Sequence, residues 1–448
     1  MVGAHPEVIP QDLQRGARTR TKKAKLRLAP DFADRAAVAR VDLSLRVVEP
    51  PGGSSSHPEF SCSSGCFRPA SGVVAVRHNV RVIDRLTTRQ LNRAILARQL
   101  LLERADYSAE RVLQHLVGMQ SQAPLAPYVG LWTRVVDFRA DELSALMIER
   151  RAVRASLMRA TIHLVTAADF LELWPVLEPV SERGLWTGSP FGRRVPRGMV
   201  NDLLAFVRDL LREAPRTRVE LRRLIGQRWP NLDTDAMAYA AQYLLPIVQV
   251  TPRGVWGQSK APTWADAEAW IGDRVSTGAA VDDLVLRYLG AFGPASVQDV
   301  QVWSGLTRLG EVADRLGPRV RRFRSEDGRV LLDGPDAPRP SADTPAPIRF
   351  LPEYDNLLLS HADRSRVVPE RRIVPLWPGN GGNRGTVLVD GFWRANWGIV
   401  PDGGQAHLCI EAFQPLPRRQ AAALAAEGHR LLAFAAASPA GDIRISVS

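Results

Sequence analysis

The sequence predicts an α+β protein, with three tandem winged helix-turn-helix modules followed by a β-rich α+β domain. Two observations lead to this fold class. Groups of helical segments followed by strands recur along the chain, which is the order of elements in a winged helix, and the C-terminal part changes to the alternating apolar and polar residues typical of strands. We expect modules at residues 82–210, 211–275 and 276–335, a C-terminal domain at 336–448, and a disordered basic extension at 1–81.

The helices of the first module follow from caps and apolar spacing. Thr87 can cap a helix whose apolar residues recur at helical spacing, and further helices are predicted from Ser108 to Gly118 and from about Ala140 to Arg150. In the segment after them, two sets of residues alternate: apolar Met158, Ala160, Ile162 and Leu164, and polar Arg159, Thr161 and His163. That period of two predicts one continuous strand with a polar face.

The second and third modules repeat this order. In the second, helices near 217–229 and 234–248 precede a pair of short strands, VQVTPRGVWGQ, with a Pro-Arg-Gly turn. In the third, helices at Ala295–Trp303 and Leu306–Leu316 meet at Ser304-Gly305, where the glycine permits a tight turn. The following segment, RRFRSEDGRVLL, predicts a hairpin with an Asp-Gly turn, which would be the wing of this module.

The C-terminal domain is predicted from its strand segments, IRFLPEYD, TVLVDGFWRANWGIV and AHLCIEAF. Residues 401–404, with the sequence Pro-Asp-Gly-Gly, suit the hairpin turn between the last two of these segments. A helix from about Pro417 to Ala437 and a final strand, IRISV, complete the domain.

Composition limits the classes of protein that this chain can be. With 45% hydrophobic and 24% charged residues, the 448-residue chain has ordinary globular composition. No apolar run approaches the roughly 18 residues needed to cross a bilayer, so an integral membrane protein is not expected. The formal net charge is +12, and 55 of the 59 basic residues are arginine. Arginine suits phosphate binding, although a GC-rich genome also explains its abundance.

We expect neither a metal ion nor another cofactor. The three cysteines, Cys62, Cys66 and Cys409, are too sparse for a disulfide framework and fit a reducing cytoplasm. Cys62 and Cys66 lie with His57 in a Ser/Gly-rich stretch that has no second pair of ligands, so a zinc site is not expected there. The sequence also has no Gly-rich phosphate loop, HExxH motif or GxSxG elbow.

One segment, GMQSQAPLAPY at residues 118–128, carries polar residues in an unusual setting. Gly118 ends the preceding helix and Pro124 disfavours helix just before it, so the segment is expected to be extended. In that geometry Gln120 and Gln122 project to the same side. Two carboxamides on one side can hold a water between them, because each offers an acceptor and two donors. The alternative is that both glutamines satisfy backbone groups of the loop.

Five separated segments resemble, in order, the tandem winged-helix family of AlkZ-type DNA glycosylases: GMQSQAP, LMRATIHLV, LVLRYLGAFGPASVQDVQVWSGL, LPEYDNLLLSHADR and VLVDGFWRANW. The resemblance covers about residues 83 to 448. It implies three winged helices that form a concave scaffold for DNA, and the excision of alkylated bases, notably N7-alkylguanine and some interstrand crosslinks. It also implies that Gln120 and Gln122 are the catalytic Gln-x-Gln motif. The middle residue is commonly larger and apolar in the family, whereas this chain has Ser121.

The chemistry of such a lesion suits neutral side chains. An N7-alkylated guanine is cationic and leaves without strong protonation, so the enzyme has mainly to place a water and to stabilise oxocarbenium-like charge. Gln120 and Gln122 can perform the first task. A glycosylase that also cleaves the strand needs an amine nucleophile, and the only lysine beyond the first 25 residues is Lys260, in a loop with nothing nearby to activate it. We therefore predict a monofunctional enzyme that leaves an abasic site.

Several other residues are candidates for contact with DNA. Arg159, Thr161 and His163 would form a wall for the DNA backbone or the lesion, although His163 suits a structural role equally well. The arginines that flank the third wing suit phosphate contacts, with a solvated face as the alternative: Arg321, Arg322 and Arg324.

The C-terminal region adds further candidates. Trp393 and Trp397, which alternate with Arg394, would lie against a DNA groove or a base, although aromatic residues at that spacing also pack cores. Asp355 would orient a partner or stabilise positive charge in the transition state. Asp363 and Arg364 are expected to form a structural ion pair.

Three function classes remain open from the sequence. The leading one is a monofunctional DNA glycosylase, acting as a monomer on double-stranded DNA that contains alkylated purines, in the cytoplasm and associated with the nucleoid. The second is a winged-helix DNA-binding protein without catalysis, such as a transcription regulator, and the third is a structural paralogue without DNA affinity. Regulators commonly read paired half-sites as small dimers, whereas this chain has its modules in tandem, which favours the enzyme.

Overall fold

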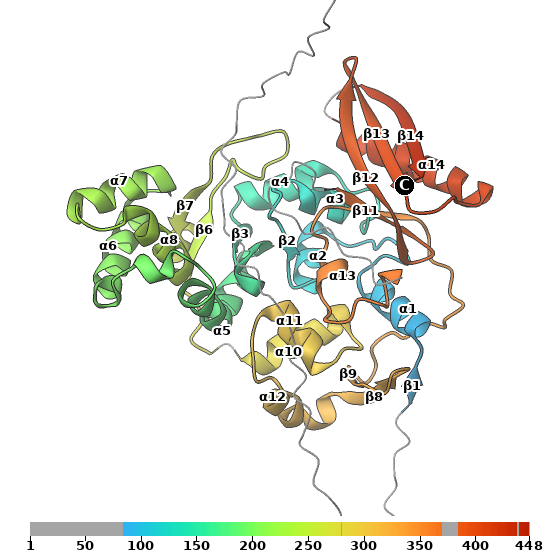
Figure 1. Cartoon of the computed structure of the whole chain (residues 1–448), viewed down its shortest axis with the longest axis horizontal. Helices are drawn as coiled ribbons and strands as arrows, with labels where there is room; N and C mark the ends of the chain where they lie inside the picture. Colours follow the sequence, from blue (N-terminus) through green and yellow to red (C-terminus); the bar gives the residue numbers. More distant parts are fainter. Residues whose placement is uncertain (1–83, 279, 370–383, 437–438, 448) are drawn as a thin grey trace, which may run out of the picture. The chain divides into compact units, whose positions relative to one another are not determined.

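The computed structural model describes residues 84–278, 280–369, 384–436 and 439–447. The basic extension predicted at 1–81 lies outside the described residues, as do His57, Cys62 and Cys66. The described chain mixes helices with strands, as the α+β class predicts (Figure 1). Within these ranges, no helix combines the length and apolar character that a membrane span requires.

The first group of elements has the order helix, strand, helix, helix, strand, strand. This group begins at α2 and is preceded by β1 and α1. The predicted cap of α1 at Thr87 is confirmed, since Thr87 Oγ1 accepts from Gln90 N and the Gln90 side chain accepts from Thr87 N. Ser108 caps the next helix by accepting from Arg111 N. The elements are β1 (Arg85–Leu86), α1 (Thr88–Arg98), α2 (Ala109–His115), β2 (Met119–Gln120), α3 (Ala126–Trp132), α4 (Ala140–Ile148), β3 (Ala152–Ser156) and β4 (Ile162–Thr166).

The prediction of one continuous strand around Met158 is wrong. Strands β3 and β4 pair antiparallel as a hairpin around the short 3-10 helix η1 (Met158–Ala160), in which Arg159 and Ala160 both have a left-handed φ of 56°. Packing explains the difference, because Leu157 and Met158 are adjacent and both are fully buried in the same core. A strand with one buried face cannot bury two neighbouring side chains on the same side.

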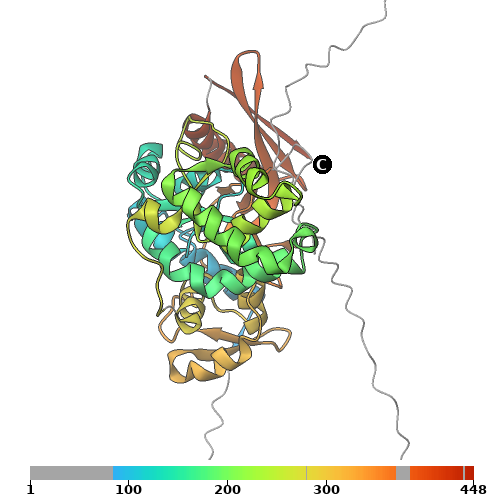
Figure 2. The same ribbon diagram turned by 90° about the vertical axis from the view of Figure 1, so that its left-hand side faces the viewer.

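In the second group both predicted helices form, although the second ends at Leu244 because Ile247–Gln249 is a strand, and the predicted hairpin does not form. Strand β6 pairs with β7 rather than with VWGQ. Residues 251–257 lie mostly in turns, and the Trp256 ring packs on the Tyr128 ring with 4.9 Å between centroids, so this stretch covers the first group instead. The elements are α6 (Val200–Glu213), β5 (Arg216–Thr217), α7 (Arg218–Arg228), α8 (Thr234–Leu244), β6 (Ile247–Gln249) and β7 (Thr263–Asp266). Helices α6, α7 and α8, drawn in green, come to the front in Figure 2.

In the third group both predicted helices and the predicted hairpin form, although the second helix begins at Gly310 rather than at Leu306. Its two short helices are separated by the tight turn at Gly305, which has a φ of 84°, and its last two strands form the predicted hairpin. Ala295 pairs with Leu332 through two backbone hydrogen bonds and so takes the place of a first strand. The elements are α10 (Val281–Phe292), α11 (Val297–Ser304), α12 (Gly310–Arg315), η4 (Gly317–Arg319), β8 (Arg321–Ser325) and β9 (Val330–Asp333).

One strand pairing recurs in all three groups: the strand before the two middle helices pairs with the last strand. It gives the orders β2-β4-β3 and β5-β7-β6, which join through β3 and β6 into a six-stranded sheet, and it places Ala295 beside β9 in the sheet β1-β8-β9. The groups are connected by α5 (Ala167–Trp186), η2 (Gly192–Arg194), η3 (Arg197–Met199) and α9 (Ala267–Ile271).

The C-terminal region is a five-stranded sheet in the order β10-β11-β12-β13-β14, packed against α14. The predicted turn is confirmed, since Asp402 pairs with Gln405 across Gly403 and Gly404. IRFLPEYD is a strand only at its start, because the chain turns at Tyr354, with a φ of 61°, and enters a short helix. The elements are β10 (Arg349–Leu351), α13 (Asn356–Leu359), β11 (Gly385–Val389), β12 (Phe392–Asp402), β13 (Gln405–Ala412), α14 (Arg418–Ala435) and β14 (Ala440–Val447).

Candidate functional site around Gln120

Gln120 lies on β2, opposite His163 on β4, and is 8% exposed. A segment distant in sequence fixes the backbone on either side of it: Gln120 N donates to Asn356 Oδ1 at 3.3 Å, and Asn356 Nδ2 donates to Gly118 O at 2.7 Å. Gly118 has a φ of 89°, and a Cβ there would lie 2.4 Å from Val165 Cγ1, so only glycine fits. The start of α13 and β4 together hold the motif strand in place.

The Gln120 carboxamide is oriented by a single arginine. Arg159 Nη2 donates to Gln120 Oε1 at 2.7 Å, and Arg159 Nη1 donates to Trp303 O at 2.6 Å. Gln122 is exposed and forms no hydrogen bond with a described residue. Neither carboxamide bonds to a backbone group within the described ranges, which disfavours the alternative that the glutamines only satisfy the loop.

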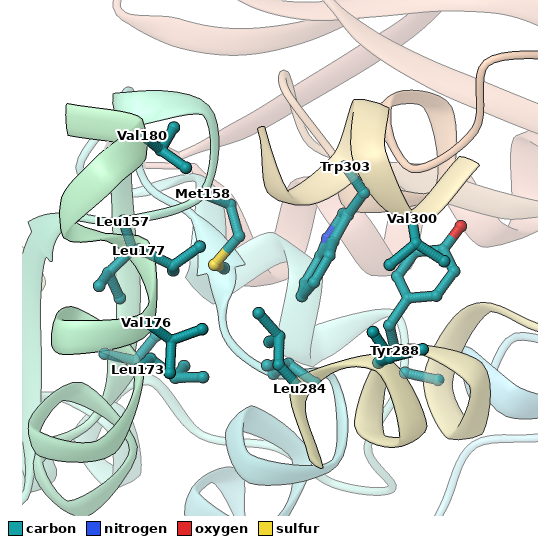
Figure 3. Packing of buried hydrophobic residues seen from close by; sticks show 14 of the residues in the cluster. Leu157, Met158, Leu173, Val176, Leu177, Val180, Leu284, Tyr288, Val300 and Trp303 are labelled. Carbon is teal, nitrogen blue, oxygen red and sulfur yellow. The ribbon is translucent and has the colours of Figure 1, made fainter. Parts of the chain in front are cut away.

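The hairpin loop that carries Arg159 is anchored by its apolar neighbours. Figure 3 shows Met158 between Leu177 of α5 and Trp303 of α11, with Leu157 on the α5 side of the same buried cluster. The turn after α11 packs closely on the same loop, since a Cβ on Gly305 would lie 2.6 Å from Val180 Cγ1 and 3.3 Å from Arg159 Cα. The third group therefore forms one wall of the site.

Ser121, the middle residue of the motif, binds a buried arginine that the sequence analysis missed. Arg154, on β3, is 2% exposed; its Nε donates to Ser121 Oγ at 3.0 Å and its Nη2 to Ser121 O at 2.7 Å, while Nη1 donates to Gln249 Oε1. Burial, followed by the charge of Arg253, lowers the pKa of Arg154 to about 9. A larger apolar residue at position 121 would leave Arg154 Nε without this acceptor, which is costly for a buried donor. The signal in the sequence was an arginine inside an apolar strand.

Arg159, Thr161 and His163 do not share the polar face of one strand, contrary to the prediction. Thr161 Oγ1 donates to Met158 O and closes the hairpin loop. His163 is fully buried, its Nδ1 bonds to Thr161 O at 2.9 Å, and its Nε2 has no partner in the described part of the chain. Burial, with the charge of Arg159 as the next cause, lowers the pKa of His163 to about 3, so this histidine is neutral at physiological pH.

Asp355 is not available to stabilise charge on a substrate. It is 4% exposed, and its two carboxylate oxygens accept from Arg134 Nη1 and Nη2, each at 2.9 Å. Asp355 Oδ1 also accepts from Leu357 N and caps α13. Its role in the structure is to hold the segment whose Asn356 binds the motif, which is the orienting role considered above.

The tryptophans of β12 are core residues, so they do not lie against DNA. Trp393 is 2% exposed and its Nε1 donates to Ala395 O; Trp397 is 7% exposed and its Nε1 donates to Leu351 O at 2.8 Å. Arg394, between them, is half-buried and lines a shallow hollow with Asp390 and Phe413. Both tryptophans therefore pack the core, which is the alternative to DNA contact that their spacing left open.

The three arginines predicted to flank the third wing are exposed, and two of these three have carboxylate partners. Arg321 pairs with Asp84, Arg322 Nη2 lies 3.0 Å from Asp314 Oδ1, and Arg324 Nη1 donates to Gly328 O. The ion pair predicted between Asp363 and Arg364 is wrong, because Asp363 pairs with Arg329.

No group of three or more His, Cys, Asp or Glu side chains that could hold a metal ion occurs among the described residues. Lys260 is exposed in the loop before β7, and Arg253 Nη1 donates to its carbonyl oxygen.

Comparison with known proteins gives the class to which this fold and motif belong. The family model described as DNA glycosylase AlkZ-like matches residues 113–434, a range that includes Gln120, Arg159 and Asn356. The chain therefore belongs to the AlkZ-like DNA glycosylase family: it is an enzyme of DNA repair, and its substrate is DNA.

Two individual matches are with proteins of Streptomyces sahachiroi. The chain is 24% identical over 299 residues to an interstrand DNA cross-link repair glycosylase of Streptomyces sahachiroi, a match that covers 62% of this chain and 78% of that protein. The solved structure of Streptomyces sahachiroi DNA glycosylase AlkZ matches with a TM-score of 0.65 at 20% identity, over 81% of this chain and 100% of that one. This likeness shows the fold.

Proposed function

We propose that the chain is a monofunctional DNA glycosylase that hydrolyses the N-glycosidic bond of alkylated purines of the N7-alkylguanine type. The observation that carries this proposal is the setting of Gln120: its backbone is fixed by Asn356 and its carboxamide oxygen by Arg159. The Gln120 Nε2 group, which has no partner among the described residues, and the exposed Gln122 are left to bind a water or the substrate. Positioning of this kind suffices for a cationic leaving group.

We further propose that the three groups of elements are winged-helix modules that hold double-stranded DNA. The recurring strand pairing supports this, since each group places its two middle helices before a two-stranded hairpin. The enzyme would act as a monomer in the cytoplasm, associated with the nucleoid. Interstrand crosslinks are a second candidate substrate, because the relative from Streptomyces sahachiroi is described as a cross-link repair glycosylase.

Base release from an oligonucleotide duplex with one N7-methylguanine tests the activity. We expect release by the parent and a loss of about a hundredfold or more for Gln120→Ala, with a loss in the same direction for Gln122→Ala. Gln405→Ala, on the exposed hairpin tip of the C-terminal sheet, is the matched control and should match the parent. Absence of release by the parent across alkylated duplexes would contradict the proposal. Equal rates of release by the parent and both site variants would support the glycosylase activity but contradict the assignment of Gln120 and Gln122 to its site.

A carboxyl group offers a rival way to activate the water. Glu353 lies in the segment that holds the motif, is half-buried and has no ion-pair partner among the described residues, and burial raises its pKa. If neutral glutamines place the water, base release should be flat between about pH 6 and 8 and Glu353→Gln should retain most of it. A steep loss in Glu353→Gln, with a rate that rises with pH in the parent, would assign the general base to Glu353.

A further inference from the structure

Arg159, which donates to Gln120, and Arg364, whose charge acts on Arg159, have no carboxylate partner among the described residues. Arg159 is half-buried and donates only to neutral acceptors, Gln120 Oε1 and Trp303 O. Arg364 is half-buried and forms no hydrogen bond or ion pair with a described residue. The two charges act on each other: burial and then the charge of Arg364 lower the pKa of Arg159 to about 10, so both stay protonated at neutral pH.

Contacts of the residues just before Arg364 show where its segment lies. Ala362 N donates to Asp299 Oδ1 on α11, and α11 also supplies Trp303 O to Arg159. Earlier in the same segment, Asn356 binds the backbone of Gln120. The chain from α13 onward therefore runs from the motif strand to α11, the helix whose Trp303 O accepts from Arg159, and Arg364 follows two residues after the contact with α11.

Two other buried arginines have a carboxylate partner, whereas Arg154, beside Ser121, also donates only to neutral acceptors. Arg134 shares both oxygens of Asp355, and Arg98 lies 2.6 Å from Asp333. Even Asp363, the residue before Arg364, is paired with Arg329 instead. Two neighbouring cations without a counterion destabilise a folded protein, so an arrangement of this kind is typical of a site for an anion.

We propose that Arg159 and Arg364 together bind one phosphodiester group of the DNA strand that carries the lesion. This rests on the proposed glycosylase function and adds the group of the substrate that the site recognises. A guanidinium matches phosphate oxygens with paired N–H donors, and Arg159 uses only two of its five N–H groups in the free protein. The phosphate fits the electrostatics as well, because oxocarbenium-like charge would otherwise develop beside two uncompensated cations. With the strand bound, the phosphate neutralises the pair.

The test is a scan of the phosphates around the lesion with the full-length protein. Each phosphate in turn is replaced by an uncharged methylphosphonate, in a duplex whose lesion sugar carries a 2′-fluorine to slow base release, and the Kd is measured by fluorescence anisotropy. For the parent, one phosphate flanking the lesion should cost about tenfold or more in affinity, the size expected for a hydrogen bond to a charged group. For Arg364→Gln the loss at that phosphate should fall below about twofold.

Two further variants act as controls. Arg364→Lys keeps the charge but not the paired donors, so it should retain part of the dependence on that phosphate. Arg444→Gln removes an exposed arginine that is paired with Asp402, 2.9 Å away at the far edge of the C-terminal sheet, and should behave like the parent at every position. Arg364→Gln removes no hydrogen bond or ion pair with a described residue, so it should fold, which its Tm checks.

The inference fails if no flanking phosphate distinguishes Arg364→Gln from the parent. Its failure is separable from that of the proposed function, because base release is measured on the same proteins with an unmodified duplex. If the parent releases the base but the scan shows no such phosphate, the glycosylase function is supported and the phosphate site is contradicted. If the parent shows the phosphate dependence but no base release, the phosphate site is supported and the proposed glycosylase chemistry is contradicted.

Discussion

Two hairpins hold the same place in the order of elements and have opposite surroundings. The loop between β3 and β4, in the first group, buries Leu157 and Met158 completely and carries Arg159 with a left-handed φ. The loop between β8 and β9, in the third group, is an exposed turn at residues 326–329. The first is a wall of the candidate site, and the second is a surface feature.

The two hairpins also differ in the partners of their arginines, and this difference follows from how deeply each loop is buried. Arg159 in the first hairpin donates to Gln120 and to a backbone carbonyl, whereas Arg321 and Arg322 in the third pair with aspartates on the surface. What separates the two loops is the neighbour: α11 of the third group packs on the first hairpin, while the turn at residues 326–329 stays exposed to solvent. One order of elements thus provides either a site or a surface arm, depending on what covers its loop.

The largest effect that we expect is a loss of stability on replacing Asp355, which pairs with the buried Arg134 next to the residue that binds the backbone of Gln120. Asp355→Ala leaves Arg134 buried without its partner, so the free energy of unfolding in urea should fall by about 3–5 kcal/mol. The matched control is Asp314→Ala, which removes the exposed partner of Arg322 and should cost less than about 1 kcal/mol. Equal losses in the two variants would contradict the contrast between a buried and an exposed charge pair.

A second prediction concerns the loss of folding stability at low pH, to which His163 in the buried hairpin should contribute. The pKa of His163 is about 3 in the folded protein, below its ordinary value of 6.5, so the unfolded chain binds a proton between these values and the folded chain does not. Stability is therefore lost as the pH falls below about 6.5, by about 2 kcal/mol at pH 5 from this group. His163→Asn should reduce the loss between pH 7 and 5 by that amount.

His429 provides the control for this experiment, because it is exposed on α14. His429→Asn should leave the pH dependence of unfolding unchanged. His361, which is also buried and whose pKa is about 3, contributes equally in both variants and in the parent, so it cancels from the comparison. If His163→Asn keeps the full acid sensitivity, His163 is protonated in the folded protein.

The smallest effect is expected at the exposed hairpin. Arg322→Ala should change the free energy of unfolding by less than about 1 kcal/mol, because its pair with Asp314 is exposed. If the third hairpin contacts a DNA phosphate, the slope of log affinity against log salt should decrease by about 1 for damaged and undamaged duplexes alike. An unchanged slope would make this hairpin a solvated face.

The sequence predicted most of the local structure, and the parts that it missed share a cause. Caps at Thr87 and Ser108, the turn at Gly305 and the hairpin at Gly403-Gly404 depend on neighbouring residues and are confirmed. The continuous strand around Met158 and the partner of β6 were wrong, because burial against distant elements decided both.

The site divides in the same way. The sequence by itself determined the family, the class of enzyme and the Gln120–Gln122 motif, because these depend on residue types in order along the chain. The predicted extended conformation of the motif segment holds only for Met119–Gln120, since residues 122–125 bend and turn into α3. Only the tertiary structure decided which charges meet: Asp355 with Arg134, Asp363 with Arg329, and Arg159 with the neutral Gln120, while Arg364 has no carboxylate partner among the described residues. The physical reason is that charge pairing depends on distance through space, and residues far apart in sequence come within hydrogen-bonding range only when the cores between them have packed.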